Sequence, residues 1–264
     1  MSNAVSKRQI DDGEYLGANM DAVLVIVVMF ATLLAAALTV PAGFGLATML
    51  TPIMLLWLDP HLAIAAVAVI HASHNGWKLI LLKTHLDVTA VKRYGWAMVL
   101  GALIGASMST SIDQKPLLIV VGFALILLPI LSATERWTSY RLPETEDRWG
   151  GFGSGLMGGL TGHQGALRAM FLQKRLPDKT AYAATAAFLA LIVDLSRLPV
   201  YLYSDGADLV EYLPLIAGSV ASAIIGVHLG KRWLIRWKKT HIRTMILCGI
   251  VASGFLYIIE GFRM

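Results

Sequence analysis

The sequence predicts an all-α polytopic membrane protein built from two inverted repeats. Hydrophobic residues make up 56% of its 264 residues and charged residues only 15%, whereas about a quarter of the residues in soluble domains are charged. The apolar residues gather in runs of about 20, the length that crosses a hydrocarbon core of about 30 Å. Similar segments also recur along the chain at a fixed spacing, which indicates an internal repeat.

The charges and the cysteine content exclude other classes of protein. The formal net charge is +5, from 22 Lys and Arg against 17 Asp and Glu. The basic residues lie in short segments between apolar runs, where membrane orientation explains them. No nucleic-acid partner is therefore expected. Cys248 is the single cysteine, so the chain can form neither an internal disulfide nor a cysteine-based metal site.

The elements follow in order along the chain. Residues 1–19 form a polar segment without the apolar centre of a cleaved signal. The first transmembrane repeat is expected at 20–133, a cytoplasmic linker at 134–148 and the second repeat at 149–260. In each repeat a Gly-broken segment, re-entrant or a pair of half-helices, precedes three transmembrane helices. The apolar runs are 20–40, 45–58, 62–82, 94–108, 117–131, 150–172, 181–203, 213–229 and 241–259.

Glycine interrupts two of these segments. Residues 41–45 read PAGFG, which cannot continue an ordinary helix, and the apolar run that follows is short for a crossing. Residues 158–165 read GGLTGHQG and interrupt the run 150–172 halfway. Broken backbone at membrane depth is tolerated only where protein buries it or where it lines a polar cavity. Both breaks are therefore expected in the interior.

The breaks occupy equivalent positions of the repeat. Gly45 and Gly162 are 117 residues apart, and so are Pro60 and Pro177. Small-residue packing is the competing interpretation for glycines in membrane helices. Packing is the favoured interpretation for three glycines of the second repeat that are spaced by four, Gly151, Gly155 and Gly159.

Charges between the runs predict opposite orientations for the two halves. Segment 205–211 contains three acidic residues and should face outside, whereas the basic segment 231–243 should face the cytoplasm. In the first half the basic segment, 83–93, comes one run earlier. The repeats are therefore expected to be inverted, in a multi-pass protein of the inner (plasma) membrane.

Arginine near the second break indicates an anion site. Arg168 follows Gly165 by about one turn, and a guanidinium inside a membrane is costly unless it pairs or meets an anion. The alternative is that it extends toward the basic segment near Lys174. Asp194 and Arg197 share one helix face, a spacing commonly used for an ion pair. Asp194 could instead offset Arg168 and leave Arg197 for the substrate, and both interpretations stay open.

His71, His74 and Asn75 form a polar cluster within the third run. Proton coupling, a metal site and hydrogen-bonded packing are the three interpretations. Further histidines lie only near the helix ends, so no metal or other cofactor is expected. For these three residues and Asp194, proton coupling and a structural role both stay open. Lys78 continues the cluster near the inner end, where extension of its amine to the membrane surface is expected.

At its two breaks the sequence resembles the TauE/SafE sulfite exporter family of membrane permeases. The resemblance rests on residues 42–48 (AGFGLAT) and 161–168 (TGHQGALR), each a Gly-rich break followed by a half-helix, and on the glycine-rich segment 218–232. It extends over residues 20–260. The resemblance implies export of sulfite, organosulfonates or related sulfur-containing anions, with both breaks near the substrate.

The sequence therefore predicts a secondary transporter, not an enzyme, that exports a small sulfur-containing anion by alternating access between two broken helices. The alternative is an intramembrane His-dependent enzyme or a metal-binding membrane protein, which the lack of HExxH and GxSxG motifs disfavours. The expected partners are the anion and the lipid bilayer, and a homo-oligomer is left open. The expected substrate-binding residues are Gly43, Phe44, Gly45, Gly162, His163, Gln164, Gly165, Arg168 and Arg197.

Overall fold

The computed structural model describes residues 22–109, 111–112, 114–133, 146–176 and 178–263, all of whose regular elements are helices. They are α1 (Ala22–Ala42), α2 (Leu46–Met54), α3 (Pro60–Leu82), the 3₁₀ turn η1 (Lys83–His85), α4 (Val88–Ser109), α5 (Gln114–Ala133), α7 (Glu146–Thr161), α8 (Gly165–Arg175), α9 (Lys179–Glu211), α10 (Leu213–Arg236) and α11 (Lys239–Arg263). The N-terminal segment 1–19 and linker residues 134–145 lie outside the described residues.

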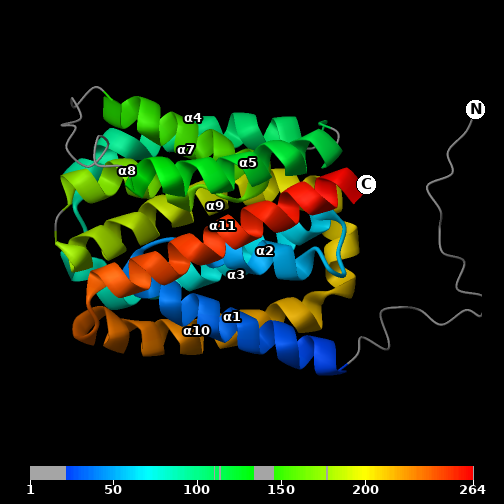
Figure 1. Cartoon of the computed structure of the whole chain (residues 1–264), viewed down its shortest axis with the longest axis horizontal. Helices are drawn as coiled ribbons and strands as arrows, with labels where there is room; N and C mark the ends of the chain where they lie inside the picture. The colour runs from blue at the N-terminus through cyan, green and yellow to red at the C-terminus, as the bar shows by residue number, and fades with distance from the viewer. Residues whose placement is uncertain (1–21, 110, 113, 134–145, 177, 264) are drawn as a thin grey trace, which may run out of the picture.

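The helices form one bundle in which they run roughly along a common direction (Figure 1). By length and composition, three described spans can cross a membrane: Val25–Ala42, Lys179–Ser204 and Leu213–Arg236. Large apolar side chains such as Phe30 on α1 and Phe255 on α11 are exposed on the outside of the bundle. A hydrocarbon environment suits such a surface, so the prediction of a helical membrane protein is confirmed at this level.

Two segments that were expected between membrane helices are themselves helical. α9 continues to Glu211 and includes the acidic segment 205–211. α10 continues to Arg236 and includes the beginning of the basic segment 231–243. The predicted ends followed the apolar runs, whereas an α-helix satisfies its own backbone hydrogen bonds and can continue into water.

Close helix pairs line two opposite sides of the bundle. α1 packs against α10 and α4 packs against α7, while α9 and α11 lie between these pairs (Figure 1). A Cβ atom on Gly151 of α7 would lie 2.7 Å from a backbone oxygen of α4, and one on Gly226 of α10 would lie 2.6 Å from a backbone oxygen of α1. Cβ atoms on Gly155 and Gly159 would also overlap the backbone of α4. The packing role predicted for Gly151, Gly155 and Gly159 is therefore confirmed.

Left-handed glycines separate α1 from α2 and α7 from α8. Gly43 has φ 78° and Gly45 has φ 111°, between the end of α1 and the start of α2. Gly162, directly after α7, has φ 82°. L side chains rarely adopt these angles, so glycine is needed where the chain leaves each helix.

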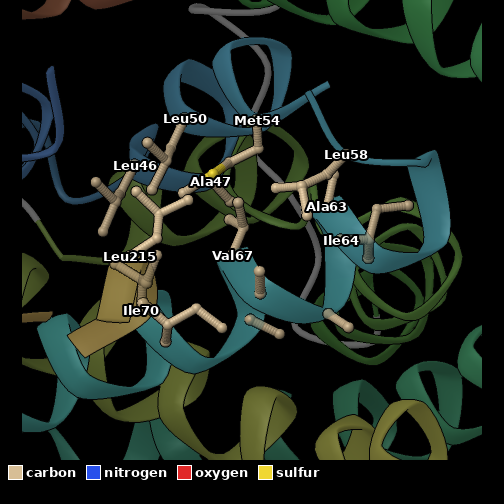
Figure 2. Close-up of a cluster of buried hydrophobic side chains, with 14 of the residues drawn as sticks. Leu46, Ala47, Leu50, Met54, Leu58, Ala63, Ile64, Val67, Ile70 and Leu215 are labelled. Atoms are coloured by element: carbon tan, nitrogen blue, oxygen red, sulfur yellow. The ribbon is translucent and has the colours of Figure 1, made fainter. Parts of the chain in front are cut away.

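An apolar cluster holds α2 in place. Figure 2 shows Leu46, Leu50 and Met54 of α2 beside Val67 of α3 and Leu215 of α10. All five side chains are buried. Because these contacts fix α2 against α3 and α10, they also fix the position of its N-terminus.

Candidate functional site

The two glycine breaks meet in the interior of the bundle. A Cβ atom on Gly165 would lie 2.7 Å from the Phe44 Cβ and 3.5 Å from the Gly45 nitrogen. A Cβ atom on Gly43 would overlap the ring of Tyr182 on α9. Glycine at position 165 therefore lets the backbones of the two breaks approach each other, and glycine at position 43 leaves room for the Tyr182 ring.

Two helices begin at this contact. α2 starts at Leu46 after Gly45, and α8 starts at Gly165 after Gln164. Neither N-terminus has a side-chain capping hydrogen bond. The first N–H groups of a helix have no acceptor within it, and its N-terminus carries partial positive charge. Two positive helix ends therefore lie together in a buried region.

Arg168 connects the second break to the first. It is on the first turn of α8 and is 1% exposed. Its Nη1 donates to the Gln164 Oε1 at 3.3 Å and its Nη2 donates to the Gly43 carbonyl at 3.3 Å. The buried Nε has no hydrogen-bond partner, and no carboxylate of the described residues forms an ion pair with the guanidinium. The guanidinium thus faces the breaks.

Asp194 and Arg197 form a fully buried ion pair on α9. Arg197 Nη2 donates to the Asp194 Oδ1 at 2.8 Å, and Nε donates to the same oxygen at 3.2 Å. The other carboxylate oxygen lies 2.6 Å from the His71 Nδ1. Gln164 Nε2 approaches Oδ1 at 3.5 Å. Of the two interpretations of this spacing, the ion pair is the one present in the structure.

Arg197 and Tyr201 also hold the end of α7. Arg197 Nη1 donates to the Gly158 carbonyl at 2.8 Å, and the Tyr201 hydroxyl donates to the Gly159 carbonyl. The Gly158 carbonyl also accepts from the Gly162 N–H at 2.9 Å. Since the last carbonyls of a helix commonly lack partners within it, the side-chain bonds stabilise the C-terminus of α7 directly before the break.

The polar cluster on α3 faces the interior. His74 Nε2 lies 3.3 Å from the Ala36 carbonyl of α1, whereas its buried Nδ1 has no partner. Asn75 Nδ2 donates to the His71 carbonyl at 2.9 Å. Lys78 is 1% exposed, so the expected extension of its amine to the membrane surface is wrong. His71 contacts α9 and His74 contacts α1, so the polar face of α3 lies against these two helices.

His163 belongs to the second break but contacts a different helix. Its Nδ1 lies 3.2 Å from the Thr161 Oγ1, and its Nε2 lies 3.3 Å from the Tyr257 hydroxyl of α11. The rings of His163 and Tyr257 pack edge to face. Both nitrogens of this buried imidazole therefore have protein partners.

Metal ligation finds no support in this arrangement. Across the part of the chain that the structure describes, no three His, Cys, Asp or Glu side chains gather closely enough to hold a metal ion. His71 instead bonds the carboxylate of Asp194.

Sequence reasoning did not identify Tyr182 and Tyr257, which cover Gly43 and His163. Each is an aromatic residue in an otherwise apolar run, without a polar neighbour that would single it out. The only available signal was indirect, because a break buried in a membrane needs side chains from other helices to cover it.

A known protein family matches most of the chain. The family model of the sulfite exporter TauE/SafE matches residues 28–257. The chain has no significant match among curated proteins or solved structures. The match includes α2, α8 and both glycine breaks, the segments that carry the resemblance. The chain thus belongs to the TauE/SafE sulfite exporter family of membrane transporters.

Proposed function

We propose that this protein is a secondary transporter that exports a small sulfur-containing anion, such as sulfite or an organosulfonate, across the inner (plasma) membrane. The anion binds where the N-termini of α2 and α8 meet. One observation carries the proposal: Arg168 is buried between two helix N-termini that lack side-chain caps, and no described carboxylate pairs with it. An anion would satisfy all three positive groups at once.

The donors of the site come from both repeats. The guanidinium of Arg168 offers a planar fork that matches two oxygens of an oxyanion. Backbone N–H groups of residues 44–45 and 164–165, together with the amide of Gln164, would provide neutral donors. The N–H groups of Gly43, Gly162 and His163 already donate within their own segments. His163 supports the second break through Tyr257. Arg197 acts as a structural residue, because Asp194 and Gly158 already accept from its nitrogens.

His71, His74 and Asn75 line the same interior and support the site. The contact between His71 and Asp194 connects α3 to α9 at a titratable group. Through this contact, protonation of His71 would act on the Asp194–Arg197 ion pair next to the break. The contact also has a structural role.

The site lies between two inverted repeats, 20–133 and 149–260. The helix contacts support this arrangement, because exchanging the halves leaves the most extensive contacts unchanged. The contact of α1 with α10 corresponds to that of α7 with α4. The contacts of α3 with α9 and of α5 with α11 each join equivalent helices. Rocking of one repeat against the other around the breaks would give alternating access.

Segment α7–α8 enters and leaves on one side of the membrane. Asp147, at the start of α7, accepts a hydrogen bond at 3.0 Å from the Nε of Arg175, the last residue of α8. The basic turns gather at the same end of the bundle. Lys179 Nζ donates to the Ile235 carbonyl at 3.3 Å, and Lys231 Nζ donates to the Leu81 carbonyl at 3.4 Å. This end is cytoplasmic in the proposal.

The opposite end is acidic. Burial and the carboxylates of Glu211, Asp59 and Asp208 raise the pKa of Tyr212, which joins α9 to α10. The turn between α9 and α10 lies at the other end of the bundle from the turn between α10 and α11 (Figure 1). Acidic residues at one end and basic residues at the other support the orientation expected from charge.

The proposal is tested by anion binding to purified protein. Arg168→Ala should weaken binding of sulfite about tenfold to a hundredfold, the effect of losing a charge-assisted hydrogen bond, and should reduce transport in proportion. Arg168→Lys should restore only part of the affinity, because an ammonium cannot form the two-pronged contact. Arg232→Ala, at an exposed arginine of α10, is the matched control. If Arg168→Ala bound and transported sulfite, sulfonates and thiosulfate normally, the proposal would be wrong.

A further inference from the structure

We infer that a polar cavity at the cytoplasmic end of the α7–α8 segment is the site where the anion first binds on its way out of the cell. Arg175 is the anion-binding residue of this cavity, and Asp147 occupies Arg175 until the anion displaces it. The inference rests on the proposed function and adds a second site for the same substrate. It arises from the cavity, the burial of Asp147 and the hydrogen bonds that converge on its carboxylate.

The cavity lies between α4 of the first repeat and the α7–α8 segment of the second. Its volume is about 110 Å³, which is room for several water molecules or one small oxyanion. Thr89 in its wall is exposed, whereas Tyr94 and Asp147 are each 1% exposed. The cavity therefore leads from the surface into the bundle. Its polar lining residues are Asp87, Thr89, Arg93, Tyr94, Asp147 and Arg175.

The carboxylate of Asp147 joins the two repeats at this cavity. Its Oδ1 accepts from the Arg175 Nε at 3.0 Å and from the Tyr94 hydroxyl at 2.9 Å. Its Oδ2 is buried and has no hydrogen-bond partner among the described residues. A buried carboxylate oxygen without a donor is unfavourable, and release of Asp147 into water would hydrate it. This imbalance favours exchange of Asp147 for another anion.

Arg175 offers an anion the same chemistry as Arg168. The two arginines are seven residues apart on α8, so they lie on nearly the same face of the helix, two turns or about 10 Å apart. The side chain of Arg175 is 24% exposed, so solutes can reach it. A carboxylate and a sulfur oxyanion present the same kind of oxygen to a guanidinium group. Asp147 therefore holds the place that an arriving anion can take.

An apolar contact lies between the two arginines along α8. Leu172 is buried in one cluster with Tyr94 and Met98 of α4. Passage of an anion toward Arg168 thus requires α8 to separate from α4. Tyr94 belongs to this apolar cluster and also bonds Asp147, so displacement of Asp147 removes a polar bond between the repeats at the same place. Binding in the cavity therefore favours the opening that lets the anion move on.

Uptake of radiolabelled sulfite into inverted membrane vesicles tests the inference, because their outer face is the cytoplasmic one. At sulfite concentrations far below KM, Arg175→Gln should lower the uptake rate about tenfold, since a charge at the entrance of a site raises the association rate. Equilibrium binding to purified protein should change less than about twofold, because Arg168 is intact. Arg175→Lys should keep most of the rate. Arg236→Gln, at an exposed arginine ending α10, is the matched control and should change neither quantity.

Asp147→Asn distinguishes a displaceable carboxylate from a structural contact. Asparagine can still accept from Tyr94 and Arg175, but without charge it competes less well with an anion for the guanidinium. Uptake at low sulfite should therefore rise at least about threefold, with equilibrium affinity unchanged. An uptake rate that stays the same or falls would show that Asp147 only fastens the helices, and the inference would be wrong.

The inference and the proposed function fail separately. Unchanged uptake by Arg175→Gln, or an equal loss of uptake and equilibrium affinity, would overturn the inference, while weaker binding by Arg168→Ala still supports the central site. Normal binding and transport by Arg168→Ala would overturn the proposed function itself.

The double variant Asp147→Asn with Arg175→Gln covers the case in which Arg175→Gln does not fold because a buried carboxylate has lost its charged partner. It should fold and take up sulfite as slowly as expected for Arg175→Gln, because the cavity still lacks its guanidinium. Wild-type uptake by the double variant would contradict the role of Arg175. Should neither variant fold, the result for Asp147→Asn decides.

Discussion

Polar side chains inside the bundle divide into two groups by their partners. Asp194, Arg197 and His71 bond one another, and Arg197 also bonds the end of α7. Arg168, by contrast, keeps a buried Nε without a hydrogen-bond partner and forms no ion pair with a described carboxylate. Charges buried without partners are unfavourable, so the first group stabilises the fold and the second is available to a ligand.

Neutralising one member of the ion pair should expose this difference. Arg197→Gln leaves the carboxylate of Asp194 buried with a weaker set of partners and should cost about 3–5 kcal/mol. The double variant Asp194→Asn with Arg197→Gln should recover much of that loss. The yield of monodisperse protein and its Tm in detergent measure both effects, with Arg232→Gln as the exposed control. A double variant no more stable than Arg197→Gln would contradict the structural role of the pair.

Individual site residues were predictable to the extent that their chemistry is unusual in a membrane. Arg168, Asp194 and Arg197 are conspicuous in apolar runs, so the sequence identified them. The burial of Lys78 was not predicted, because a lysine near a helix end ordinarily reaches the membrane surface. Whether it can do so depends on the helices around α3, which the local pattern does not specify.

Among the elements, the two broken segments position the site. α1 and α7 each end directly before a left-handed glycine, and a short helix starts a few residues later. The prediction of a break at each place rests on glycines, with Pro41 added at the first. The ends of α9 and α10 were not predictable from hydropathy, because an α-helix satisfies its own backbone hydrogen bonds and can continue beyond the membrane into water.

Gly43→Ala tests the geometry of the first break. Alanine at φ 78° is strained, and its Cβ would also overlap the ring of Tyr182. We expect a loss of about 1–2 kcal/mol from the backbone alone, and weaker anion binding because the Gly43 carbonyl contacts Arg168.

Gly76→Ala in α3 is the matched control for this change. A Cβ there would meet only a Leu191 methyl group at 3.9 Å. This variant should be as stable as the wild type or slightly more stable, by the helix preference of alanine over glycine. Thermal unfolding and sulfite titration check both variants. A Gly43→Ala protein with unchanged Tm and affinity would contradict the proposed geometry of the break.

For the whole molecule, the orientation of the halves is open to direct measurement. Cys248 is replaced by alanine, and single cysteines are introduced at exposed positions 85, 208 and 238. A membrane-impermeant thiol reagent added to intact cells should label only position 208. Positions 85 and 238 should react after permeabilisation, because they belong to the basic end. Labelling of positions 85 and 208 from the same side would exclude the inverted arrangement.

The architecture was predictable only in part. The offset of 117 residues that recurs along the chain predicted that the two breaks occupy equivalent positions of the repeat. It does not say how far apart the two halves lie in space. That Gly165 lies against Phe44 results from the packing of α3, α9 and the helices around them. Contacts between residues far apart in the chain determine where the two N-termini meet, and no local pattern encodes them.

The most direct test of the anion site is anomalous diffraction from crystals grown with selenate, in which selenium takes the place of sulfur. We expect a selenium peak between the N-termini of α2 and α8, with the selenate oxygens within hydrogen-bond distance of the Arg168 guanidinium. The peak should be absent from crystals of Arg168→Ala. A selenium peak elsewhere, with none beside Arg168 although selenate binds in solution, would contradict the proposed site.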